Sequence, residues 1–191
     1  MKFLFVMGIS LILAGFPILV GAESLPADSS LLLADFGRGD YAVEGHFRVP
    51  ASRPIVWQVL TDYDHMPRFI SSMQICQVQS RKDDHLLLKQ EAEGHLWVFS
   101  KRIEVLLSVL ETPMTEITFE DIGNKDFSSY QGSWEIRESI PGMLEVIYRL
   151  NAKRKFPAPG FLAKAAFEKN VGSLLNEVRA EMLRRQERKP V

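Results

Sequence analysis

Hydrophobic and polar residues alternate along residues 41–49, which is typical of a half-buried strand. The apolar face carries Tyr41, Val43, Gly45, Phe47 and Val49. Pro50 ends this pattern, and Ser52 followed by Pro54 marks the start of a short helix that extends to Leu60. Residues 66–70 predict a second short helical turn.

A run of strand-like segments with little helical pattern follows. The segments cover residues 73–79, 86–93, 95–109, 116–122, 130–139 and 143–153, separated by turn signals such as Glu111-Thr112-Pro113 and Pro141-Gly142. From residue 161 to about 185 the spacing changes to steps of three and four, which predicts one long helix. Its apolar stripe contains Phe167, Val171, Leu174, Val178 and Met182.

This order of elements predicts an α+β fold. Antiparallel strands followed by a segregated helix bury their apolar faces against each other. We therefore expect a curved antiparallel sheet of about six or seven strands around the C-terminal helix, with two short helices after the first strand.

The first 40 residues differ from the rest of the chain. Met1-Lys2 precedes an uncharged apolar run, and Val20-Gly21-Ala22 resembles a signal-peptidase site, so residues 1–22 are predicted to be a signal peptide. An uncleaved anchor is the alternative. Residues 23–40 are predicted to be a tether or an edge element, residues 41–185 the domain and residues 186–191 a basic tail. We therefore expect an exported protein, periplasmic or extracellular.

The segment VPASRPIVWQVLTDYDHMPRFI at residues 49–70 resembles the opening of the polyketide cyclase/dehydrase and coenzyme-Q-binding family of START-like (SRPBCC, helix-grip) proteins. The FPAPGF segment at residues 156–161, followed by a long helix, is similar too. The resemblance covers about residues 41–185 and implies a cavity between sheet and helix. That superfamily includes lipid carriers, hormone receptors, cyclases and dehydratases, and a shared fold does not determine the chemistry.

Side chains of one parity on the predicted strands should face the helix and line this cavity. The expected lining is Trp97, Phe99, Ile117, Phe119, Tyr130, Trp134, Val146, Tyr148 and Leu150, with Phe167, Val171, Leu174 and Val178 from the helix. A solid core made of the same residues is the alternative. Tyr and Trp combine an apolar body with a polar group, which suits the orientation of an amphipathic ligand.

Candidate catalytic groups are few. His95 shares a parity with Trp97 and Phe99, so His95 and Tyr148 are weak candidates for proton transfer, with Lys101 as a partner. The four histidines lack metal-ligand spacing, and the sequence contains one cysteine. We therefore expect no metal site, and no glycine-rich phosphate loop suggests a cofactor.

Charge is unevenly distributed along the chain. The formal net charge of -1 argues against a nucleic-acid partner, but residues 149–189 are rich in Lys and Arg. This excess is either a solvated helix face or a contact with anionic lipid headgroups. Lys153, Arg154 and Lys155, next to Phe156 and Phe161, are the candidates for such a contact.

The sequence therefore favours an exported, non-catalytic binder or carrier of a hydrophobic or amphipathic small molecule, such as a lipid or polyprenyl quinone. The alternative is a cyclase or dehydratase acting on a polyketide-like substrate. A third reading is an interaction module whose interior is filled by its own side chains.

Overall fold

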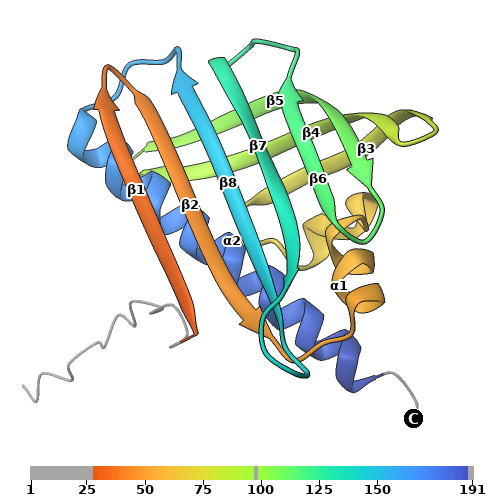
Figure 1. Cartoon of the computed structure of the whole chain (residues 1–191). Helices are drawn as coiled ribbons and strands as arrows, with labels where there is room; N and C mark the ends of the chain where they lie inside the picture. Colours follow the sequence, from red (N-terminus) through yellow and green to blue (C-terminus); the bar gives the residue numbers. More distant parts are fainter. Residues whose placement is uncertain (1–27, 97–98, 189–191) are drawn as a thin grey trace, which may run out of the picture.

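The computed structural model describes residues 28–96 and 99–188, with only the backbone described at residues 94–96 and 99–101. Eight strands and three helical segments follow one another along the chain (Figure 1). They are β1 (Ser29–Gly37), β2 (Asp40–Val49), α1 (Arg53–Leu60), the 3-10 helix η1 (Tyr63–Arg68), β3 (Met73–Lys82), β4 (His85–Leu96), β5 (Phe99–Thr112), β6 (Glu116–Asp121), β7 (Phe127–Glu138), β8 (Leu144–Arg154) and α2 (Gly160–Glu187).

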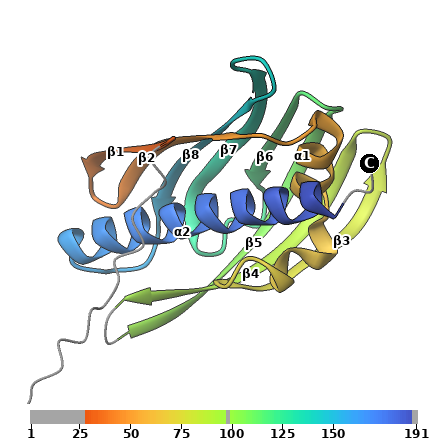
Figure 2. The same ribbon diagram turned by 90° about the horizontal axis from the view of Figure 1, so that it is seen from below.

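All eight strands form one antiparallel sheet in the order β1-β2-β8-β7-β6-β5-β4-β3. The sheet curls so that β1, β2 and β8 lie on one side of α2 and β3, β4 and β5 on the other (Figure 2). The predicted helix-grip architecture is therefore confirmed.

The strand count is slightly higher than predicted, because residues 29–37 form a strand rather than a tether. Ser29–Gly37 pairs along β2, so the edge-element reading of this stretch holds for these residues. Leu31, Leu32 and Leu33 are consecutive apolar residues, which hides the alternation by which other strands are recognised. Leu31 and Leu33 pack against the core, and Leu32 is exposed.

The Leu175 side chain of α2 packs directly over Gly45 of β2, which has no side chain of its own. A Cβ atom at Gly45 would lie 2.5 Å from Leu175 Cδ1, closer than such contacts occur. Leu175, Val178 and Met182 are almost fully buried, whereas Phe167 and Leu174 are only partly buried. The space that remains between the sheet and α2 lies along residues 163–178 of the helix.

Candidate functional site

Two adjoining chambers lie between the curved sheet and α2. The first has a volume of about 200 Å³ and the second about 110 Å³. Both volumes together reach the lower end of the range of about 300–1,000 Å³ typical of ligand pockets. The chambers share part of their walls.

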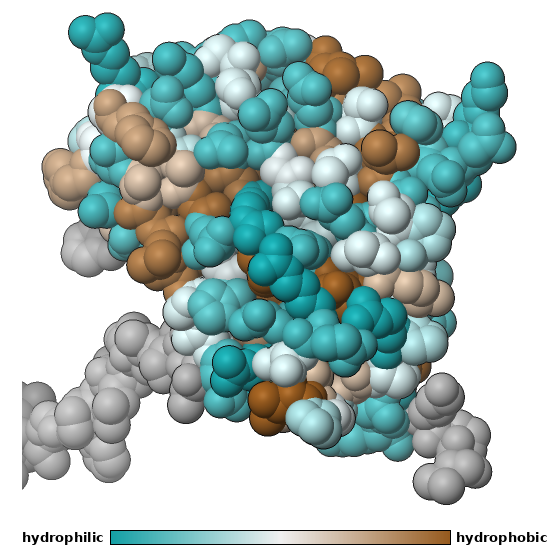
Figure 3. Space-filling model, in the orientation of Figure 1, coloured by the Kyte–Doolittle hydropathy of each residue, from teal (hydrophilic) through white to brown (hydrophobic). Residues whose placement is uncertain are grey.

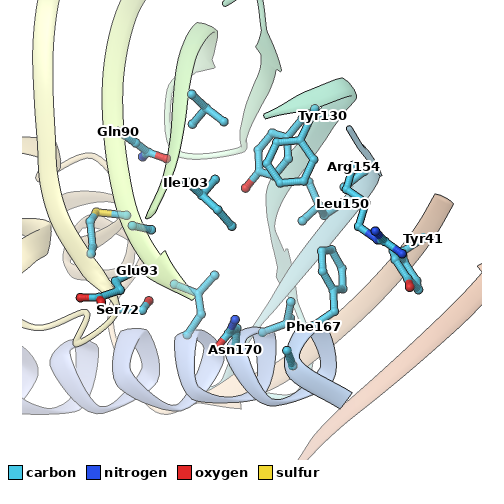
Figure 4. A pocket seen from close by; sticks show the side chains of 18 of the residues that line it. Tyr41, Ser72, Gln90, Glu93, Ile103, Tyr130, Leu150, Arg154, Phe167 and Asn170 are labelled. Carbon is cyan, nitrogen blue, oxygen red and sulfur yellow. The ribbon is translucent and has the colours of Figure 1, made fainter. Parts of the chain in front are cut away.

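The first chamber is walled by β4 and β5 on one side, by β7 and β8 on the other, and by the N-terminal half of α2 (Figure 4). Phe167 and Asn170 of α2 point toward it, opposite Ile103 and Tyr130. Tyr41 stacks on Phe167 with ring centroids 5.4 Å apart. An apolar wall with a few polar groups suits an amphipathic ligand.

The second chamber lies deeper, under α1 and η1. Leu60, Tyr63 and Met66 line it from the helical side, and Leu107 and Val109 line it from β5. Among the described residues, none that lines this chamber carries a charged side chain. Tyr63 is held by its hydroxyl, which donates a hydrogen bond to Glu111 Oε1 at 2.8 Å.

Five aromatic rings from β6, β7 and β8 line the two chambers on the side of the sheet. Trp134 and Tyr148 have ring centroids 4.5 Å apart, and Phe127 and Tyr130 are 4.8 Å apart. Phe119 stacks on Tyr148 at 6.3 Å. Such contacts fix large side chains in one arrangement, so this wall is preformed.

Burial keeps the two tyrosine hydroxyls of this wall neutral. It raises the pKa of Tyr130 to about 12, although a hydrogen bond with Tyr148 opposes the shift. Burial and the neighbouring Tyr130 raise the pKa of Tyr148 well above its usual value. At neutral pH both groups therefore act as hydrogen-bond donors and acceptors, not as bases.

Most of the residues predicted to line the cavity do line one chamber or both. They are Ile117, Phe119, Tyr130, Trp134, Tyr148, Leu150, Phe167, Val171, Leu174 and Val178. Val146 lines neither chamber: it is fully buried in the sheet, flanked by Phe47 and Ile136, where side chains fill the interior. Trp97 lies outside the described residues, and only the backbone of His95 and Phe99 is described, in β4 and β5.

Several lining residues are absent from the sequence-based prediction. Tyr41, Gln90, Phe127 and Asn170 all line the first chamber. Gln90 shares the parity of Leu86 and Leu88, so alternation along β4 could have identified it. Asn170 lies on the helix beside the apolar stripe, where no local pattern distinguishes a cavity residue from a surface residue.

The three basic residues at the end of β8, Lys153, Arg154 and Lys155, do not form one outward face. Arg154 is partly buried, lines the first chamber and donates from Nη2 to the carbonyl of Ala158 at 2.8 Å. Lys153 and Lys155 are exposed, with Lys153 Nζ 3.6 Å from Asp40 and Lys155 donating to the carbonyl of Asn124. Alternation along the strand turns the middle residue inward.

Two further features bear on the candidate chemistry. Within the described ranges, no cluster of His, Cys, Asp and Glu side chains has the arrangement of a metal site. No helix within the same ranges has the length and apolar character needed to cross a bilayer.

Solved structures with the same fold include a STAR-related lipid transfer protein and an aromatase/cyclase. Human STARD10 is 12% identical, with a TM-score of 0.68 over 87% of this chain and 74% of that chain. The Zhui aromatase/cyclase from Streptomyces sp. R1128 is 14% identical, with a TM-score of 0.66 over 76% of this chain and 95% of that chain. A STAR-related lipid transfer protein from Xanthomonas axonopodis is 16% identical, with a TM-score of 0.64 over 83% of this chain and 97% of that chain.

These identities show a shared fold, and no curated protein sequence matches the chain significantly. The family described as polyketide cyclase / dehydrase and lipid transport matches residues 49–179, which is more than half of the sequence. The chain belongs to this family.

Proposed function

We propose that this protein binds and carries a hydrophobic or amphipathic small molecule, such as a lipid or polyprenyl quinone, in its two chambers. The observation that carries the proposal is the preformed apolar space between the sheet and α2, bordered by aromatic rings. Burial alone supplies affinity, since each methylene group removed from water contributes roughly 0.8 kcal/mol.

The alternative function is a cyclase or dehydratase acting on a polyketide-like substrate. Its support is the likeness to the Zhui aromatase/cyclase together with the Tyr148 hydroxyl in the cavity wall. His95 or Tyr148 would then move the proton. An enzyme should lose turnover but keep its fold after His95→Ala or Tyr148→Phe, whereas a carrier should keep its ligand after His95→Ala.

The proposed setting is outside the cytoplasm, since the first 22 residues have the pattern of a signal peptide. Docking to an anionic membrane surface is proposed for the end of the molecule where α2 begins. Phe161 is 75% exposed there, and Lys153 and Lys155 are exposed nearby in sequence. An exposed aromatic side chain with cationic neighbours suits the headgroup region of such a membrane.

Native mass spectrometry of protein purified from its own host tests the carrier proposal. We expect an adduct that organic extraction releases as a lipid-like molecule. The variant Leu174→Trp, which places a large side chain at the wall shared by both chambers, should lose the adduct. Glu168→Gln, on an exposed position of the same helix, should keep it.

Two results together contradict the carrier proposal. They are the absence of any adduct on the wild-type protein and the failure of an apolar fluorescent dye to bind the ligand-free protein. The second result alone indicates that the interior does not admit apolar molecules in solution.

A further inference from the structure

Six residues border both chambers, and three of them are polar. The six are Ile70, Met73, Gln90, Tyr130, Tyr148 and Leu174. We refer to this set as the junction. Polar groups inside an apolar cavity are costly unless they have a hydrogen-bond partner, so their presence points to a recognition role.

The junction holds a hydrogen-bond donor that no described protein group uses. The hydroxyls of Tyr130 and Tyr148 share one hydrogen bond, which uses one of their two protons. The other proton is left for another acceptor, and the Tyr130 hydroxyl points into the first chamber (Figure 4). The Gln90 amide donates one N–H to Cys76 Sγ at 3.4 Å, which leaves its second N–H and its carbonyl oxygen available to a ligand.

None of the six junction residues carries a charge. Among the described side chains, the charged ones that line the first chamber are Glu93 and Arg154, both outside the junction. The Glu93 carboxylate is directed away from the chamber, and the Arg154 guanidinium lies beside Tyr41 (Figure 4). This guanidinium donates to the carbonyls of Phe156 and Ala158 and keeps a buried Nε–H without a partner within the described ranges. A phosphate or carboxylate placed at the junction itself would therefore lack an adjacent counter-charge, which is unfavourable.

We infer that the junction is a binding subsite for a neutral carbonyl oxygen of the ligand, such as that of a ketone or an ester. The Tyr130 hydroxyl donates to this oxygen, and the Gln90 amide supplies a second donor. The apolar remainder of the ligand lies along the chambers. The hydrogen bond with Tyr148 polarises the Tyr130 hydroxyl and strengthens its donation. This inference rests on the proposed function and adds the chemical class of the ligand.

The test compares two probes of similar length, 2-decanone and decane, by displacement of an apolar fluorescent dye from the full mature protein. In Tyr130→Phe we expect the affinity for 2-decanone, relative to decane, to fall about tenfold, since one hydrogen bond is lost. Decane binding should stay within twofold and serves as the internal control. A relative affinity that is the same in both proteins overturns the inference.

Two further measurements complete the test. Tyr148→Phe leaves the Tyr130 hydroxyl in place, so the relative affinity for 2-decanone should fall less than in Tyr130→Phe; an equal or larger fall contradicts the assigned roles. Decanoate tests the restriction to neutral ligands: its affinity should stay within twofold in Tyr130→Phe, because its carboxylate has no counter-charge at the junction, and a fall equal to that of 2-decanone overturns the restriction. If neither 2-decanone nor decane binds the wild-type protein, the proposed carrier function fails as well.

Discussion

At the scale of single residues, Gly132 shows how tightly the aromatic wall is packed. A Cβ atom at this position would lie 2.2 Å from the carbonyl oxygen of Arg149 and 2.6 Å from Phe119 Cζ. Phe119 can therefore lie against the strand and stack on Tyr148 only because Gly132 has no side chain.

We predict that Gly132→Ala lowers the free energy of unfolding by about 1–3 kcal/mol, the usual cost of overpacking. Gly172→Ala is the matched control, since Gly172 lies within α2 and a Cβ atom there has no atom within 4 Å. It should raise the stability by roughly 0.5–1 kcal/mol because alanine favours a helix. Urea unfolding measures both; equal changes would argue against the packing explanation.

Buried thiol and phenol groups make the stability fall at high pH. Burial raises the pKa of Cys76 to about 12 from 9.0 and that of Tyr130 to about 12 from 10.0. Above pH 9 the unfolded chain loses these protons first and binds fewer protons than the folded chain. The free energy of unfolding should therefore decrease between pH 9 and 11, by up to about 1.4 kcal/mol per pH unit and group.

Urea titrations between pH 8 and 11 measure this dependence. Cys76→Ala should flatten the part of the curve that begins near pH 9, and Tyr130→Phe the part that begins near pH 10. An unchanged slope in both variants would show that these groups ionise as readily in the folded protein as in the unfolded chain.

At the scale of elements, polar contacts fasten the segment around η1 to α2. Arg185 donates to Asp62 Oδ2 and to Glu181 Oε1, each at 2.6 Å, and its guanidinium lies over the Phe69 ring. Ser71 Oγ donates to Glu177 at 2.5 Å. Since Met66, Ile70 and Met73 of this segment line the chambers, these contacts hold part of the chamber wall.

We predict that Arg185→Ala destabilises the protein by about 1–3 kcal/mol, because it removes the hydrogen bonds to Asp62 and to the buried Glu181 together with the contact to Phe69, while Glu181 keeps Arg184. Arg184→Ala is the control: Arg184 contacts the same carboxylate, but its side chain is 45% exposed, so its loss should cost less than about 1 kcal/mol. Thermal unfolding compares the two. Equal losses would mean that Arg185 contributes only a surface ion pair.

The elements themselves are largely predictable from the sequence, and the cavity is not. Period-two alternation predicts β2, and the three- and four-residue steps predict α2, because each faces the core with one side. The volume of the cavity depends on the distance between α2 and the sheet. Val146 and Tyr148 share a parity, yet Val146 packs solidly and Tyr148 borders a chamber, and only the tertiary arrangement separates them.

At the scale of the whole molecule, apolar side chains are exposed on the side of β1. Leu32 and Phe36 of this edge strand are exposed, and hydrophobic residues gather on that side of the surface (Figure 3). Phe161 is exposed at the start of α2, beyond the first chamber. The arrangement supports the proposed contact with a membrane near this end.

We predict that the protein sediments with vesicles of anionic lipid and that Phe161→Ser reduces the bound fraction severalfold. Ile140→Ser, which changes an exposed apolar residue in the β7–β8 turn, should leave binding unchanged. High salt should weaken binding, since the attraction to headgroups is screened. If Phe161→Ser and Ile140→Ser bind the vesicles equally well, the membrane contact lies elsewhere on the protein.

The proposed signal peptide leads to a separate prediction about the N-terminus of the protein. Expressed in its own host, the protein should begin at Glu23, after removal of residues 1–22. Intact mass spectrometry combined with N-terminal sequencing measures this. A chain that retains its first 22 residues and fractionates with membranes would support the anchor alternative.

The missing side chain at Gly45 bears on the chambers although Gly45 lines neither of them. Leu175 Cδ1 occupies the space that a Cβ atom at this position would need, so a larger residue there must displace the almost fully buried Leu175 side chain. Leu175 follows Leu174, which borders both chambers. A substitution on β2 therefore reaches the interior space indirectly, through the turn of α2 on the far side of the glycine.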